Sequence, residues 1–343
     1  MPAEWEQHQA TWISWPHEES DWPGKFEPVK WVYAEIVRAL APSEQVEILC
    51  DSDAVEAEAR FCTSQFRIRP DRIRFHKVRS NRSWLRDSMP IGVVPAAGGL
   101  SWVQWRFNAW AKYDNFELDG EVPAAAARIS GIPLVQALRP DNGEPMVLEG
   151  GAIDVDGAGT MLTTEECLLS AVQERNPGLS RGGYEEAFSR YLGIKKTIWL
   201  GRSCEGDDTH GHVDDAARFV KPGVVVVAVE ADPSDPNYEI GADNLQRLSH
   251  AVDAAGRKVE AVKLPMPGPV FFAGQRLPAS YANFYIGNSV VLVPTFNDPN
   301  DTVALTIIRG LFPGRSVVGI ACTDLVLGLG TLHCLTQQQP SGS

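Results

Sequence analysis

The chain has 343 residues and a formal net charge of -13 at pH 7, which argues against nucleic acid and anionic membranes as partners because binding either needs a basic face. The same charge would attract a small cationic substrate, although it would equally serve solubility alone. The sequence has no stretch of roughly 18 apolar residues, no secretory signal and no CxxC pair among its six cysteines, so we expect a cytoplasmic protein with free thiols.

The first third of the chain alternates helix-like and strand-like segments. Apolar periodicity predicts helices over 28–40 and 53–61 and strands over 45–50, 73–78 and 91–94. The polar run 80–90 lies between two of these strands, and such connections carry function more often than cores do. Asp87 in this run is therefore a candidate site residue, although an ion pair with Arg86 is the simpler interpretation of that residue alone.

A hydrophobic strand over 146–149 is expected to end in Glu149, directly before Gly150 and Gly151. The Asp156-Gly157 turn then begins a second strand in the manner of a hairpin. A carboxylate where the backbone can be approached closely suits a cation anchor. A plain turn residue fits the pattern equally well.

The densest polar cluster of the chain runs from Asp207 to Asp215. If this stretch is extended, His210, His212 and Asp214 lie on one face at a period of two. Two sites are then possible: His212 as a general base beside a cation-binding Asp214, or His210 and His212 as ligands of a divalent metal completed by a carboxylate. A solvated acidic loop is the third interpretation.

The remaining pattern predicts further helices and strands before the chain reaches Cys334. We expect helices over 184–192, 243–255 and 302–311 and strands over 196–200, 224–229, 259–264, 290–294 and 317–320. Cys334 follows the turn Gly328-Leu329-Gly330, which lets the backbone bend close to a ligand. The sulfur is nucleophilic only as a thiolate and needs a base or a cation nearby, and a buried, inert cysteine beside His333 is the alternative.

Candidate residues recur along the chain with a rough rhythm. Asp87, Glu149, His212, Asn283 and Cys334 each lie where a strand gives way to a turn, at separations of 62, 63, 71 and 51 residues by their numbers. Repeat architectures place equivalent loops on one common face. The spacing therefore indicates, without visible identity between units, that these side chains meet.

At these residues the chain resembles the agmatine deiminase and Porphyromonas-type peptidylarginine deiminase family of the guanidino-group-modifying superfamily. The resemblance extends over almost the whole chain. The motifs that carry it are Met1-Pro-Ala-Glu-Trp, Trp84-Leu-Arg-Asp87, Trp105-Arg-Phe-Asn108, Leu148-Glu-Gly-Gly151, Gly211-His-Val-Asp214, Asn283-Phe-Tyr-Ile286 and His333-Cys-Leu-Thr-Gln-Gln-Gln-Pro340.

The resemblance implies an α/β fold, the five-bladed α/β propeller of pseudo-fivefold ββαβ units, as a single catalytic domain over 1–343. It implies no cofactor, no metal and often a homodimer. It makes Cys334 the nucleophile, His212 the proton shuttle, Asp87 and Asp214 the carboxylates that grip a guanidinium, and Glu149 a further acidic partner. The substrate-binding residues expected beside them are Trp84, Trp110, Asp208, His210 and Gly330.

The implied function is a cysteine hydrolase that deiminates agmatine to N-carbamoylputrescine and ammonia, a step of polyamine synthesis, through a covalent amidino-thioether on Cys334. Asp208 and His210 stand where the family usually has Glu and Asn, and in the family that Glu lies near the distal amine of the substrate. These departures leave a different guanidine as an alternative substrate, such as free arginine or a C-terminal peptidyl arginine. A metal-dependent hydrolase built on His210, His212 and Asp214 is an alternative of another class.

Overall fold

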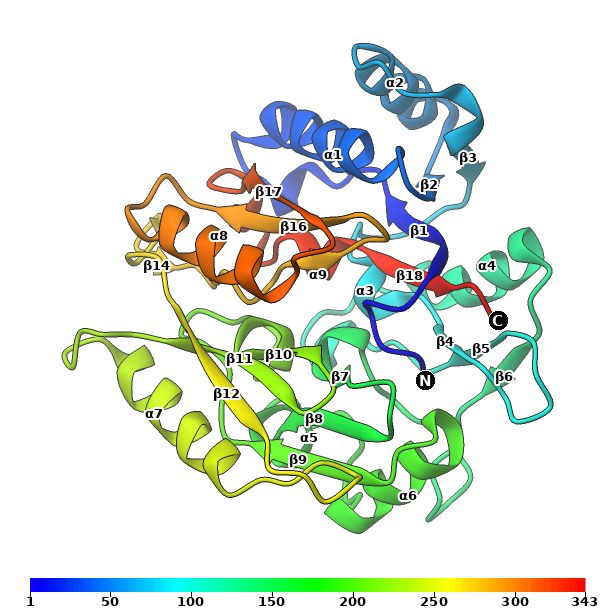
Figure 1. The fold of residues 1–343 in the computed structure, drawn as a ribbon. Coiled ribbons are helices and arrows are strands. Elements are labelled where there is room, and N and C mark those ends of the chain that lie inside the picture. The colour runs from blue at the N-terminus through cyan, green and yellow to red at the C-terminus, as the bar shows by residue number, and fades with distance from the viewer. Residues whose placement is uncertain (343) are drawn as a thin grey trace.

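The strands of the computed structural model, which describes residues 1–342, form five sheets of three or four strands and one separate hairpin, β13-β14 (Figure 1). The sheets have the strand orders β18-β1-β2-β3, β4-β5-β6, β7-β8-β9, β10-β11-β12 and β15-β16-β17. The strands are β1 His8–Ser14, β2 Gln45–Cys50, β3 Ile73–Lys77, β4 Ile91–Val93, β5 Ser101–Gln104, β6 Leu134–Gln136, β7 Asp154–Val155, β8 Thr160–Thr164, β9 Lys196–Leu200, β10 Ala217–Lys221, β11 Val224–Val229, β12 Glu260–Pro265, β13 Phe271–Phe272, β14 Gln275–Arg276, β15 Tyr285–Ile286, β16 Val290–Thr295, β17 Ser316–Ala321 and β18 Gln337–Pro340.

One pairing pattern recurs in all five sheets. The first two strands of each sheet are antiparallel, and the second and third are parallel. A helix lies in the chain between the two parallel strands, because parallel neighbours need a crossover connection. These crossover helices are α1 Phe26–Leu40, α4 Val122–Ser130, α6 Arg181–Leu192, α7 Pro236–Ser249 and α8 Asn300–Leu311. The chain is therefore a mixed α/β structure of repeated units.

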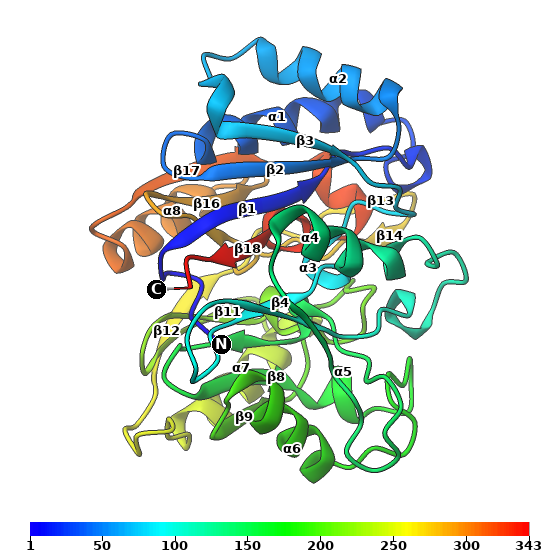
Figure 2. The same ribbon diagram turned by 90° about the vertical axis from the view of Figure 1, so that its right-hand side faces the viewer.

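The other helices are shorter or lie outside this pattern. They are α2 Asp53–Ser64, α3 Leu85–Ser88, α5 Glu165–Leu169 and α9 Leu332–Leu335. Figures 1 and 2 place α2, α6 and α7 at the periphery, whereas α3 lies nearer the middle of the molecule. Within residues 1–342 no helix has both the length and the apolar character needed to cross a membrane.

The two ends of the chain meet in the first sheet. Strand β18 pairs antiparallel with β1, so that Trp12 lies opposite Gln337 and His8 opposite Pro340. Both views show the red C-terminal strand beside the blue N-terminal strand (Figures 1 and 2). The turn that carries Cys334 in α9 leads directly into β18, so its position depends on this closure.

Most predicted elements are confirmed, one helix has different bounds, one expected strand is wrong, and the extended form considered for 210–214 is not adopted. The helix predicted over 243–255 is α7, which begins earlier because Pro236 occupies its first turn behind an Asp235 cap, and ends at Ser249. The segment 146–149 forms no strand, and Val147 contributes one isolated bridge to Arg106. The segment 210–214 is not extended: His210 has a φ of 60°, and a 3-10 turn follows over Val213–Asp215.

Candidate active site

Five equivalent segments, each just before the first strand of a sheet, bring the predicted residues together. Asp87 precedes β4, Glu149 precedes β7, His212 precedes β10, Asn283 precedes β15 and Cys334 precedes β18. The expectation that each residue follows a strand is thus reversed, although the predicted rhythm itself reflects the repeated sheets. Helix α3 contacts α9 and the 3-10 turn after Glu149, and that turn contacts the one after His212.

A cavity of about 390 Å³ opens above this junction. Six of the residues expected at the site line it: Trp84, Asp87, Trp110, Asp208, Gly330 and Cys334. The other three carboxylate and imidazole groups lie deeper, because Glu149, His212 and Asp214 are almost completely buried. The thiol therefore stands at the floor of an open cavity, and the titratable groups behind it are shielded from water.

The turn that carries the thiol is held by an asparagine side chain. Asn283 Nδ2 donates to Cys334 Sγ at 3.1 Å, and Asn283 Oδ1 accepts from Thr331 Oγ1 at 2.8 Å and from the His333 amide at 3.0 Å. A Cβ on Gly330 would lie 3.2 Å from Cys334 Sγ and 2.9 Å from the Trp84 ring, so this position needs glycine. Sequence analysis placed Asn283 in the rhythm but did not give it this role.

The Cys334 thiol is poor as a nucleophile while the cavity is free of cations. Burial raises the pKa of Cys334 well above its usual range, and Asp214, Asp215 and Asp87 raise it further. Asp214 Oδ2 lies 3.8 Å from Sγ, within reach of a thiol proton. A cation bound among these carboxylates would offset their charge and favour the thiolate.

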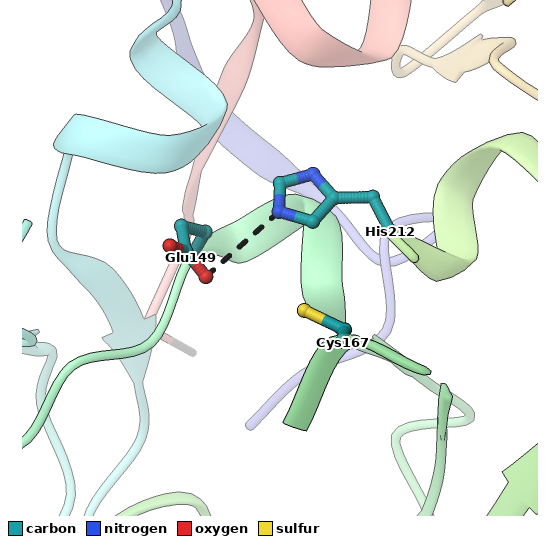
Figure 3. Close-up of side chains that lie close together, drawn as sticks. All are labelled: Glu149, Cys167 and His212. Carbon is teal, nitrogen blue, oxygen red and sulfur yellow. Dashed lines mark ion pairs between the residues drawn. The ribbon is translucent and has the colours of Figure 1, made fainter. Parts of the chain in front are cut away.

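His212 lies between two carboxylates. Its Nδ1 is 3.9 Å from Asp87 Oδ1 and its Nε2 is 3.8 Å from Glu149 Oε2, the ion pair drawn in Figure 3. Although burial alone would lower it, Asp87 and Glu149 raise the pKa of His212 to about 9, so the ring is an imidazolium at neutral pH. Both separations exceed hydrogen-bond length, so the two ring N–H groups are buried without acceptors.

The carboxylates present one free oxygen each beside this ring. Glu149 Oε1 accepts from Arg175 at 2.9 Å, and Asp214 Oδ2 accepts from His333 Nδ1 at 2.6 Å, whereas Glu149 Oε2 and Asp214 Oδ1 make no hydrogen bond to the residues that the structure describes. Despite burial, which alone would raise it, Arg175 and His212 hold the pKa of Glu149 at about 2. Two shielded acceptors of this kind suit a planar cation with several N–H donors.

Asp87 is anchored differently. Its Oδ1 accepts from the Gly151 amide at 3.1 Å and its Oδ2 from Trp110 Nε1 at 2.9 Å. Burial, followed by the nearby Glu149 and Asp214, raises the pKa of Asp87 to about 6 although His212 opposes the shift. Asp87 is thus mainly ionised at neutral pH and titrates close to it.

A second buried network, which sequence analysis missed, supports Asp214 and Cys334 from behind. His333 Nε2 contacts Glu4 Oε2 at 2.9 Å, while Arg86 and Arg218 donate to the same carboxylate at 3.1 and 2.9 Å. Burial alone would raise it, but Arg218, His333 and Arg86 together hold the pKa of Glu4 well below its ordinary value. The Met1-Pro-Ala-Glu motif signalled that this segment matters without indicating what Glu4 touches.

His210 does not join the site. The backbone of His210 has a positive φ, and its Nε2 lies 3.1 Å from Ser170 Oγ. The residue lines a different cavity, together with Glu165 and Arg247. Among residues 1–342, the sets of three potential metal ligands within 4.8 Å of one another do not include it. The alternative of a metal centre built on His210, His212 and Asp214 is therefore unsupported, because the turn that carries these residues is not extended.

The two sets that do cluster are Glu149, Cys167 and His212 (Figure 3), and Asp214, Asp215 and Cys334. In the first set Arg175 already pairs with Glu149, His212 is cationic, and burial raises the pKa of the Cys167 thiol well above its usual range. A metal would have to displace two protons beside a fixed guanidinium. In the second set Asp214 is already bonded to His333. The donor chemistry therefore fits proton transfer and cation binding better than a resident metal.

Comparison with known proteins gives a consistent result. The model of the Porphyromonas-type peptidyl-arginine deiminase family matches residues 1–340. Agmatine deiminase of Medicago truncatula is 37% identical, with 99% of this chain and 96% of the relative covered.

Solved structures agree with this. Agmatine deiminase of Enterococcus faecalis superposes with a TM-score of 0.89 at 33% identity, covering 100% of this chain and 96% of that one. A substrate-bound cysteine-to-serine variant of the C. jejuni agmatine deiminase superposes with a TM-score of 0.87 at 27% identity, covering 100% and 96%. With its whole length matched, the chain belongs to the Porphyromonas-type peptidyl-arginine deiminase family.

Proposed function

We propose that the protein is an agmatine deiminase, which converts agmatine and water to N-carbamoylputrescine and ammonia. The observation that carries the proposal is the set of buried, unpartnered atoms around the Cys334 thiol: two carboxylate oxygens and both nitrogens of a cationic imidazole. A guanidinium supplies the N–H donors that these oxygens lack. The relatives across the whole chain that are named agmatine deiminase support the choice of guanidine.

In the proposed reaction, Asp87, Asp214 and Glu149 hold the guanidinium over Cys334. The bound cation offsets the carboxylates that raise the pKa of the thiol, so the thiol releases its proton to solvent and the thiolate attacks the central carbon. The carbon–sulfur bond forms, and the guanidine becomes tetrahedral. His212, already an imidazolium, protonates a nitrogen, and ammonia leaves as the carbon–nitrogen bond breaks.

The second half of the reaction uses the same imidazole in the opposite sense. Neutral His212 takes a proton from a water molecule, which attacks the amidino-thioether carbon. The carbon–sulfur bond breaks and the thiolate leaves, the added oxygen releases its remaining proton to solvent, and a ureido product remains. Asn283 Nδ2, which lies 3.1 Å from Sγ, would stabilise the departing thiolate by a hydrogen bond.

The finer structural expectations belong to the same proposal. We infer a five-bladed α/β propeller in one catalytic domain, supported by five sheets with one pairing pattern and by five site segments that each precede a first strand. The six unpaired thiols support a reducing compartment such as the cytoplasm. A homodimer remains an expectation that light scattering on the purified protein would measure.

Agmatine is proposed over arginine because the cations Arg82 and Lys112 are already paired with Asp21 and Asp208, so they are not available to bind the carboxylate that distinguishes arginine from agmatine. The test is ammonia release from agmatine, arginine and a C-terminal arginyl peptide in parallel, with Cys334→Ala as the blank. We expect turnover of agmatine that Cys334→Ala abolishes. Turnover of arginine or the peptide alone would contradict the proposed substrate, and activity in Cys334→Ala would contradict the proposed chemistry.

A further inference from the structure

Two aspartates line the cavity away from the thiol, and they differ in what their oxygens already bind. Asp208 Oδ1 is paired with Lys112, and Asp208 Oδ2 accepts from Tyr113 Oη at 2.7 Å. Both oxygens of Asp208 are therefore engaged, and an ammonium beside it balances its charge. A substrate cation would have to compete with Lys112 for this group.

Asp21 has one oxygen to spare. Its Oδ1 is paired with Arg82, whereas its Oδ2 is buried and makes no hydrogen bond to the residues that the structure describes. The residue is 7% exposed and lines the same cavity as Cys334. The Trp84 indole N–H lies near enough to lower the pKa of Asp21, but Oδ2 is left without a hydrogen bond of normal geometry. A shielded carboxylate oxygen on a residue that lines a cavity is an acceptor that awaits a donor.

Asp21 also keeps its charge at neutral pH. Burial raises the pKa of its carboxyl to about 6 although Arg82 opposes the shift. At pH 7 and above the carboxylate is therefore mainly ionised and able to pair with a cation.

Trp84 connects this carboxylate with the thiol. The ring atom Cζ3 lies 2.9 Å from the position that a Cβ on Gly330 would occupy, and that position is 3.2 Å from Cys334 Sγ. The nitrogen at the other end of the indole lies beside Asp21. An apolar arm of a few carbons laid along the indole would therefore lead from the thiol to the carboxylate.

We propose that Asp21, and not Asp208, binds the distal ammonium of the substrate and so selects a guanidine with a cationic tail. The proposal rests on the proposed function, because it assumes a guanidinium held above Cys334. It also explains how the chain accommodates an amine although Asp208 is engaged by Lys112. The substrate class is then an ω-guanidinoalkylamine.

The test compares agmatine with n-pentylguanidine, which replaces the ammonium by a methyl group on an arm of the same length. We expect Asp21→Asn to raise KM for agmatine about 30-fold, as loss of a shielded charge pair does, with little change in kcat. For pentylguanidine both constants should stay within about twofold, because a methyl group makes no use of the carboxylate.

A matched control is available in Asp119. This residue is 1% exposed, its Oδ2 is also unpartnered, and burial raises its pKa to about 6, but it does not line the cavity. It lies close to Arg82 as well, since its Oδ1 accepts from the Arg82 amide. Asp119→Asn should therefore affect agmatine and pentylguanidine equally.

The outcomes separate this proposal from the proposed function. Equal effects of Asp21→Asn on the two guanidines, or no effect on either, would overturn the role of Asp21, and a selective loss in Asp208→Asn alone would assign the ammonium to Asp208. Calorimetric binding to Cys334→Ala gives a readout that does not require turnover. If wild type releases no ammonia but Cys334→Ala binds agmatine only when Asp21 is present, the reaction is wrong and the ammonium site stands. Absence of binding would overturn both.

Discussion

The Cys334 thiol is expected to react far faster with a cationic electrophile than with a neutral one of the same shape. The pair to compare is 2-chloroacetamidine and 2-chloroacetamide, which share a leaving group and differ in charge. Burial and three carboxylates raise the pKa of Cys334, so a neutral reagent meets mainly the unreactive thiol. The amidinium brings its own counter-charge to the carboxylates.

The size of the difference follows from the separation between Asp214 Oδ2 and Sγ, which is 3.8 Å. Two unit charges about 4 Å apart interact by about 4 kcal/mol at the effective dielectric constant of a partly shielded site. One pKa unit corresponds to about 1.4 kcal/mol, so a cation at such a distance would raise the thiolate population by up to about 1000-fold. Water in the open cavity screens part of this, and we expect a ratio of about 100 to 1000.

The assay is the second-order rate constant of inactivation at pH 7.5, divided for each reagent by its rate with glutathione. Mass spectrometry should find the label on Cys334 and none on Cys334→Ala. Asp214→Asn should narrow the ratio, because it removes one of the charges that the amidinium balances. A corrected ratio near one in the wild type would refute the electrostatic argument, since the thiol would then ionise without a cation.

Three further predictions concern the architecture of the site. Gly151→Ala should abolish turnover without changing the circular dichroism spectrum, because the added Cβ would lie 2.4 Å from His212 Nδ1. As a control, Gly310→Ala in helix α8 should keep activity and add about 0.5–1 kcal/mol of stability, because no atom lies within 4 Å of the added Cβ. Glu4→Gln should lower the free energy of unfolding, measured in urea, by about 3–5 kcal/mol, because two buried guanidinium groups lose their counter-charge. As a control, Glu27→Gln should change this free energy by no more than about 0.5 kcal/mol, because the Glu27 side chain is 80% exposed. The pKa of His212 is about 9 in the folded protein and 6.5 in its ordinary state, so the charge of the ring stabilises the fold fully below pH 6.5 and this stabilisation is lost as the pH rises through 9. Between these limits the free energy of unfolding of the wild type should fall by roughly 3 kcal/mol more than that of His212→Gln. Thermal melts that change with pH in the same way for both proteins would contradict this.

Elements whose apolar residues follow a regular period could be predicted from the sequence. Helix α1 and strand β11 lie within a few residues of their expected bounds, because alternation and helical periodicity report which face is buried. The regular spacing of the site residues could also be anticipated, because each residue precedes the first strand of a unit and the units have similar lengths. The catalytic roles of these residues remain predictions.

The turn over 207–215 shows where this reasoning ends. His210 and His212 would share one face only if this stretch were extended, and the residue pattern did not decide whether it is. In the structure Asp207 Oδ2 accepts from the amides of Gly211 and His212 at 2.8 and 3.0 Å, and this side-chain cap holds the backbone in a tight turn. Asparagine and aspartate side chains compete with regular structure in this way, and the residue pattern does not reveal which amide they will bind.

The setting of the nucleophile depends on contacts that no local pattern can encode. Glu4 and His333 are 329 residues apart, and their contact lies beside the junction of β1 with β18. Loop closure over such a distance carries only a slowly growing entropy penalty, so a few well-buried charge pairs are able to stabilise it. His333 then orients Asp214 through a 2.6 Å hydrogen bond, which leaves Asp214 Oδ1 without a hydrogen-bond partner among the described residues, as the proposed guanidinium site requires. Asp214, one of the carboxylates that raise the pKa of Cys334, is thus oriented from the meeting of the two chain ends, and we expect the selective reactivity of the thiol to depend on the closed first sheet.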